Sequence, residues 1–206
     1  MKIELPNSWA GVTVEQFQAL QRILAEKGDE YPTNVAIISI MSGVPVDEIE
    51  TYSLKTYAKC MQTLSFLTEQ LVGQVQKAVE FGGVRYDVIT DVYNLNGGQY
   101  ITLMHLMKDP DKVIDQLHEV MAVFLVPRKK TWWGWKKGKY DPEKHKETSE
   151  AMLQAPMTIV QPLSAFFLSS YLMSAKHILE SSVKKAEKIK RQAERRLKRL
   201  NRNMAG

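Results

Sequence analysis

"VQKAVEFGGVRYDVI", residues 75–89, is the stretch that decides the fold class, because the hydrophobic period of the chain changes there. Two short runs rich in β-branched and aromatic residues flank Gly82 and Gly83. Both glycines tolerate the positive φ that a two-residue hairpin turn requires. The segment therefore predicts a β-hairpin near residues 75–90.

Outside this hairpin, apolar residues recur at helical spacing and are preceded by helix-capping residues. Thr13 is followed three residues later by Gln16, which is the pattern of a capping box. Ser53 precedes a longer amphipathic stripe, and Asn96 precedes another. These signals predict helices that begin directly after each capping residue.

Two further helices are expected with less distinct boundaries. A short apolar helix over residues 35–41 would be capped by Thr33 or Asn34 and closed by Gly43. A helix that follows the Asn96 helix is expected to end near Val126. The sequence thus predicts a mainly α protein, in which a helical domain carries a small inserted β-hairpin.

The end of the chain differs in charge from the rest. Residues 184–202 contain ten Lys or Arg and two Glu, a net charge of +8, and since the whole chain carries +5, the remainder carries −3. Such asymmetry is typical of contact with nucleic acid or with an acidic protein surface. The candidate residues for phosphate or acidic-partner contacts here are Lys190, Arg191, Arg195, Arg196 and Arg199.

Apolar residues in this basic segment are spaced by alternating fours and threes, which predicts a helix that packs along another helix. The chain is accordingly divided into a helical body, residues 1–175, and an extended basic C-terminal helix, residues 176–206. The candidate partner-contacting residues of that helix are Leu179, Val183, Leu197 and Leu200.

Residues 127–141 show neither a helical nor a strand period and are expected to form a loop. They contain three Trp and six Lys or Arg, and the one acid is Asp141 at the end. The aromatic candidates for an interface are Trp132, Trp133, Trp135 and Tyr140. The basic candidates are Lys129, Lys130, Lys136 and Lys137.

Three interpretations of this loop are open. The aromatic rings could dock on their own subunit, with the lysines solvated around them. They could anchor a protein–protein contact, where Trp, Tyr and Arg concentrate binding energy. They could also stack on nucleic-acid bases while the lysines meet phosphates. The protein contact is favoured over nucleic acid, because the extended basic helix also requires another chain.

The sequence offers no positive sign of catalysis, and we expect neither enzymatic activity nor a cofactor. Gly97 and Gly98 lack the Lys of a phosphate-binding loop. The single Cys60 lies on an apolar helix and is expected to be buried and inert. No two histidines stand at the spacing that places two metal ligands on one helical face; they are His105, His118, His145 and His177.

No targeting or membrane-spanning segment is expected. The first residues contain no apolar signal region. The most apolar late stretch, residues 156–173, is interrupted by Gln161 and Pro162 and is short for a span. One cysteine in the chain excludes an internal disulfide framework and fits a reducing cytoplasm, where synthesis is expected.

The order of elements resembles a known family. The stretches that carry the likeness are "LPNSWAGVTVEQFQAL", "AIISIMSGVPVDEIE", "FGGVRYDVITDVYNLNGGQYITLMHLM" and "PLSAFFLSSYLM". Together, over roughly residues 1–175, they resemble the ring proteins of crAss-like short-tailed phages, which stack below the portal to form the tail barrel. The same layout also looks like tail-assembly chaperones, which bind a structural protein and leave the finished particle.

The resemblance implies a structural virion protein that forms a homo-oligomeric ring in the head-to-tail connector, following the twelvefold symmetry of the portal. Its partners would be the portal, the neighbouring tail-barrel proteins and possible contacts with genomic DNA passing through the conduit. It implies no catalytic, metal-binding or cofactor-binding residue. The competing class is a nucleic-acid-binding protein that uses the basic helix and the Trp-containing loop.

Overall fold

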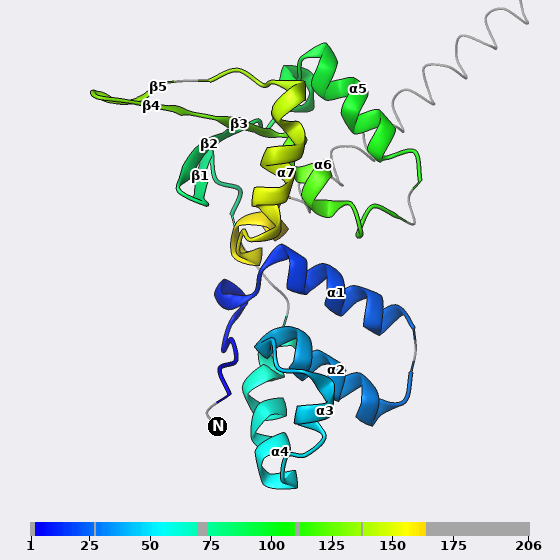
Figure 1. Ribbon diagram of the computed structural model, residues 1–206. Helices are drawn as coiled ribbons and strands as arrows, with labels where there is room; N and C mark the ends of the chain where they lie inside the picture. The colour runs from blue at the N-terminus through cyan, green and yellow to red at the C-terminus, as the bar shows by residue number, and fades with distance from the viewer. Residues whose placement is uncertain (1–2, 27, 70–73, 110–111, 137, 164–206) are drawn as a thin grey trace, which may run out of the picture. The chain divides into compact units, whose positions relative to one another are not determined.

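The computed structural model describes residues 3–26, 28–69, 74–109, 112–136 and 138–163, all of which fall in the first of two units of the chain, Met1–Ala165 (Figure 1). This unit is mainly helical and contains a small antiparallel sheet, as the sequence predicts. The expected C-terminal helix lies outside the described residues.

The N-terminal part consists of helices joined by short turns. They are η1 (Trp9–Gly11), α1 (Val14–Ala25), α2 (Glu30–Ser42), α3 (Val46–Ile49), α4 (Leu54–Thr63) and η2 (Leu64–Thr68). The predicted capping box of α1 is present, and the Ser53 hydroxyl accepts a hydrogen bond from the Thr56 backbone N–H at the start of α4. Cys60 of α4 is buried, and burial raises the pKa of its thiol.

The start of α2 differs from the prediction. The helix begins at Glu30, after an extended Asp29. Thr33 and Asn34 therefore lie within the helix and neither is its N-cap, contrary to the prediction. Pro32 falls in the first turn, where a missing N–H removes no helical hydrogen bond, so the helix can run through it. Its end is as predicted, since Gly43 takes a left-handed φ of 72°.

The predicted β-hairpin is confirmed. Strands β1 (Ala78–Phe81) and β2 (Val84–Val88) pair antiparallel across Gly82 and Gly83, whose φ angles are 57° and 71°. Positive φ at both turn positions defines the type I′ geometry that suits the twist of paired strands. The two glycines therefore predict this turn correctly.

The sheet has a third strand that the sequence did not indicate. Strand β3 (Leu125–Pro127) pairs antiparallel with β2, so that Asp87 lies opposite Val126. The helix expected to end near Val126 instead ends at Val123. Residues 120–126 are all buried and apolar, and a continuous apolar run has no period that separates a helix from a strand.

The remaining helices follow the first β-hairpin in the chain. They are η3 (Val92–Asn94), α5 (Gly97–Leu106), α6 (Leu117–Val123), η5 (Pro142–Lys144) and α7 (His145–Leu153). Helices α6 and α7 lie side by side, and Phe124, directly after α6, is among the most buried side chains (Figure 1). The core of this part is therefore centred on α6 and β3.

Two capping-box glutamines also join neighbouring helices. Gln16 caps α1, and its Nε2 donates to the Ile40 carbonyl oxygen at 3.2 Å, in the last turn of α2. Gln99 caps α5, and its Nε2 donates to the Val123 carbonyl oxygen at 2.6 Å, at the end of α6. Each amide thus satisfies one of the carbonyls that a helix leaves without an internal partner at its end.

Candidate functional site

The segment expected to be a loop contains a second β-hairpin. Strands β4 (Lys129–Thr131) and β5 (Gly134–Lys136) pair antiparallel, and they project from the end of β3 as a two-stranded ribbon (Figure 1). The turn consists of Trp132 and Trp133, and Gly134 follows with a φ of 127°, a value that favours glycine. The Thr131 hydroxyl donates to the Gly134 carbonyl oxygen at 2.8 Å. Residues 129–136 are called the Trp hairpin below.

The tip of the Trp hairpin is a pair of exposed indole rings. Trp132 is 83% exposed and Trp133 is 79% exposed, and the rings stack on each other with centroids 3.7 Å apart and planes inclined by 28°. The interpretation that the aromatic rings dock on their own subunit therefore does not describe these two residues. Trp135 is half-buried and lies opposite Lys130 in the strand register.

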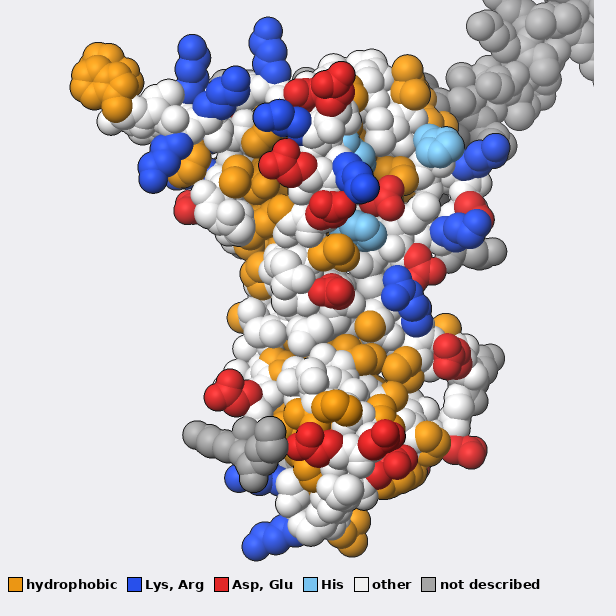
Figure 2. Space-filling view, viewed as in Figure 1, with side chains coloured by type: hydrophobic (Ala, Val, Ile, Leu, Met, Phe, Trp, Pro, Cys, Tyr) orange, Lys and Arg blue, Asp and Glu red, His pale blue; other side chains and the backbone are white. Residues whose placement is uncertain are grey.

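The strands below the tip are basic. Lys129, Lys130 and Lys136 are exposed, and the register places Lys129 directly opposite Lys136. Like charges in directly opposed positions destabilise a β-ladder. Figure 2 shows Lys and Arg side chains gathered behind a protruding apolar tip. The electrostatics of the hairpin therefore favour an anionic binding partner.

An ion pair fixes the base of the hairpin to the central sheet. The Arg128 guanidinium donates from Nε and from Nη2 to Oδ1 of Asp87, at 2.8 Å and 2.5 Å, and its backbone N–H donates to the Arg85 carbonyl oxygen at 2.7 Å. The hydrogen bond to Asp87 raises the pKa of Arg128, which stays charged. The residue before β4 is thus held in place while the hairpin itself extends into solvent.

A basic cleft of about 640 Å³ lies beside the hairpin. Its basic lining residues are Arg128, Lys129, Lys136, Lys139 and Lys144. Gly138 packs closely against the end of β3, because a Cβ atom there would clash with the Pro127 carbonyl oxygen. The basic side chains of the cleft can bind an anionic group. The cleft is separate from the stacked indole rings, which lie at the hairpin tip.

Tyr140, a predicted interface residue, is half-buried in the lining of the same cleft. Its hydroxyl lies 3.3 Å from Nδ1 of His145, the first residue of α7. The ring is therefore engaged by its own subunit, unlike the two indoles at the hairpin tip. Lys137 lies outside the described residues.

The candidate residues of the basic C-terminal segment also lie outside the described residues. They are Leu179, Val183, Lys190, Arg191, Arg195, Arg196, Leu197, Arg199 and Leu200. Of the two predicted contact segments, the structure therefore describes the Trp hairpin and not the basic C-terminal segment.

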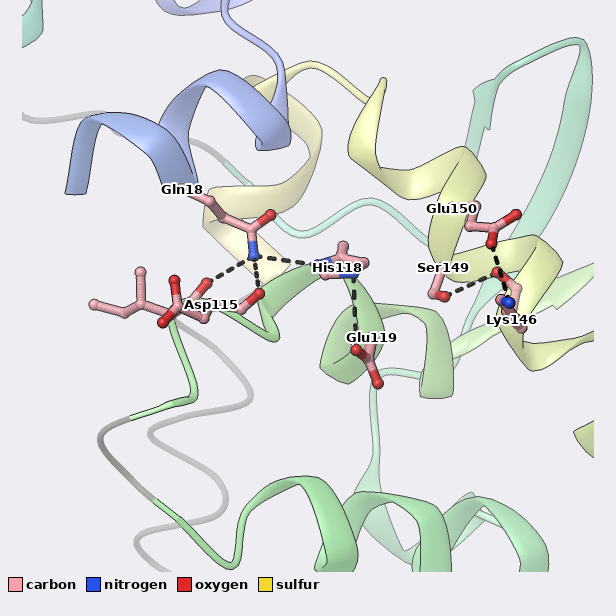
Figure 3. Close-up of polar contacts among 8 residues, drawn as sticks. Gln18, Asp115, His118, Glu119, Lys146, Ser149 and Glu150 are labelled. Atoms are coloured by element: carbon pink, nitrogen blue, oxygen red, sulfur yellow. Dashed lines mark hydrogen bonds and ion pairs between the residues drawn. The ribbon is translucent and has the colours of Figure 1, made fainter. Parts of the chain in front are cut away.

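A buried polar cluster that the sequence did not indicate joins α1 to α6 (Figure 3). The Gln18 Nε2 donates to the backbone carbonyl oxygens of Ile114 and Asp115, at 2.8 Å and 2.6 Å, and lies 3.1 Å from Nδ1 of His118. Gln18 is fully buried, whereas glutamine is mostly exposed in proteins. No spacing in the sequence distinguishes it from an exposed helical glutamine.

The two histidines near this cluster favour their neutral forms. Burial lowers the pKa of His118, with Glu119 opposing the effect and Arg22 adding to it. Burial likewise lowers the pKa of His145, whose Nε2 is buried without a hydrogen-bond partner among the described residues. Within those same residues, no three His, Cys, Asp or Glu side chains gather as a metal site. We infer that the cluster around Gln18 stabilises the packing of α1 against α6.

Comparisons with protein-family models, with curated proteins and with solved structures each found no match. Among the helices that the structure describes, none combines the length and the apolar character that a membrane span requires. The class of protein is therefore inferred from the geometry of the Trp hairpin and the basic cleft.

Proposed function

We propose that this chain is a non-enzymatic assembly protein whose Trp hairpin inserts into a neighbouring protein. The particular assembly we propose is a homo-oligomeric ring in the head-to-tail connector or tail barrel of a short-tailed phage. The observation that carries the proposal is the pair of stacked, exposed rings of Trp132 and Trp133 at the tip of a projecting hairpin. A ring built from head-to-tail contacts requires two different faces on each subunit, and the hairpin supplies one of them.

Contact with another protein explains the two exposed indole rings better than their permanent exposure to solvent on a free monomer. Large aromatic side chains with few rotatable bonds are the residues that most often dominate binding energy at interfaces. The Trp pair is already stacked, so part of the ordering cost of binding is met before the partner arrives. An isolated two-stranded ribbon is also marginally stable in water, which a partner along its length would correct.

A second candidate function is binding of nucleic acid, which the basic cleft beside the hairpin favours. Bases could stack on the indole rings while the lysines meet phosphates. The geometry gives weaker support to this function, because Trp132 and Trp133 cover one face of each other. Each ring then has one face left for a base.

Salt dependence separates the two functions. Phosphate contacts release counterions, so the logarithm of DNA affinity falls by about 0.7–0.9 per contact for each tenfold rise in salt. An apolar Trp contact survives the same change. Replacing Lys129, Lys130 and Lys136 by Gln should therefore weaken DNA binding sharply, yet leave a Trp-anchored protein contact largely intact, because exposed charge pairs contribute about 0–1 kcal/mol each.

The decisive test of the ring is the composition of purified particles, together with native mass spectrometry of the full chain mixed with neighbouring virion proteins. We expect the protein in the particle and a cyclic oligomer in the mixture. Absence from particles combined with a stable complex with one structural protein would identify an assembly chaperone instead. Absence from particles without any complex, together with salt-sensitive DNA binding, would support the second candidate function.

A further inference from the structure

We propose that the acceptor for the Trp hairpin is the acidic face of a second copy of this chain, formed by α2 to α4. This inference rests on the proposed function and names the contact through which subunits would join. The acidic face is defined by Asp29, Glu30, Tyr31, Glu50, Leu54 and Tyr57.

The acidic face presents apolar groups that have no cover in the described structure. Leu54 is 81% exposed and Tyr31 is 54% exposed. The Tyr31 ring contacts the Tyr57 ring, with centroids 5.6 Å apart, and so joins the start of α2 to α4. Leu54 lies three residues before Tyr57 on α4 and therefore shares its side of the helix. Together the three side chains offer a platform for indole rings.

The charge of this face is opposite to that of the hairpin. Residues 29–63, which span α2 to α4, contain five Asp or Glu and two Lys, whereas residues 126–144 contain seven Lys or Arg and two Asp or Glu. Figure 2 shows acidic side chains interspersed with apolar ones over the N-terminal helices. Complementary charge on two faces accelerates encounter and opposes pairing of identical faces. A hairpin-to-hairpin contact would oppose two strongly basic surfaces.

Charge also distinguishes the acidic face from the exposed apolar side chains around α5. This α5 region includes Tyr93 and Ile101, which is 70% exposed. Residues 91–108 contain one Asp and one Lys, so this region offers no net charge to a basic hairpin. Compared with the α5 region, the acidic face matches the hairpin in charge as well as in apolar character.

Two blocked variants of the full chain test the head-to-tail contact. The hairpin variant carries Trp132→Ser and Trp133→Ser, and the face variant carries Glu50→Lys and Leu54→Lys. All four positions are exposed, so both variants should fold, which circular dichroism and thermal melting check. Ile101→Ser is the matched control, because it removes a similarly exposed apolar group from the α5 region.

We expect each blocked variant alone to self-associate at least about 30-fold more weakly than the wild type in native mass spectrometry or sedimentation. Mixing the two should restore a one-to-one dimer, because each variant retains the face that the other lacks. The control should assemble as the wild type does. A face variant that assembles normally, or a mixture that yields no dimer although the wild type assembles, would overturn the acidic face as the acceptor.

The proposed function and this inference fail in different ways. Presence in particles together with normal assembly of the face variant would retain the ring and overturn the acceptor. Absence from particles together with recovery of the mixed dimer would overturn the ring and retain the self-contact.

Discussion

Replacing Trp132 by Ala should leave the free energy of unfolding of the monomer nearly unchanged. The side chain is 83% exposed, so roughly one sixth of the 150–250 Å² that a fully buried aromatic residue removes from water is involved, or ~25–40 Å². At about 25 cal/mol per Å², this area corresponds to a loss of ~1 kcal/mol at most. Part of it is contact with Trp133, which belongs to the same projecting hairpin.

Phe124→Ala is the matched control, because Phe124 is 1% exposed in the core behind β3. Truncation of a buried Phe costs about 3–5 kcal/mol. Urea unfolding of the monomer, followed by circular dichroism, measures both variants against the wild type. A loss of about 3 kcal/mol or more for Trp132→Ala would refute the reasoning, because it would mean that the ring packs on its own subunit.

The remaining predictions concern the described body of the chain. Gln18→Ala should lower the free energy of unfolding by about 1–3 kcal/mol, because the buried amide and its hydrogen bonds to two backbone carbonyls before α6 are lost, whereas exposed Gln62→Ala should change it little in the same urea titration. The folded-state pKa values of His118 and His145 lie below the ordinary 6.5, so their contribution to stability should be complete above pH 6.5 and lost as the pH falls through the folded values. A wild-type unfolding midpoint that does not decrease, relative to that of a double His→Gln variant, when the pH is lowered from 7.5 to 5 would contradict this. Gly138→Ala should separate the segment from β3 by steric conflict and lower the melting temperature, and an unchanged melting temperature would show that the close approach is not needed.

Local sequence determined the parts of the fold that depend on a few adjacent residues. The capping box at Thr13 and the turn at Gly82 and Gly83 were predictable, because a side-chain cap and a positive φ are properties of the residues themselves. The opposite charges of the N-terminal helices and of residues 126–144 were also set by the sequence. They required no knowledge of which side chains meet.

Only the tertiary structure decided which segments pair and which polar groups are buried. Strand β3 forms because β2 has a free edge with which it can pair. A uniformly apolar run of residues does not indicate whether such an edge is close in the folded protein. Gln18 is buried because the carbonyls before α6, almost a hundred residues away in the chain, supply its acceptors. The exposure of Trp132 and Trp133 has the same origin. Whether an indole ring is covered depends on the direction in which Arg128 and Asp87 anchor the hairpin, and that contact joins residues 41 positions apart.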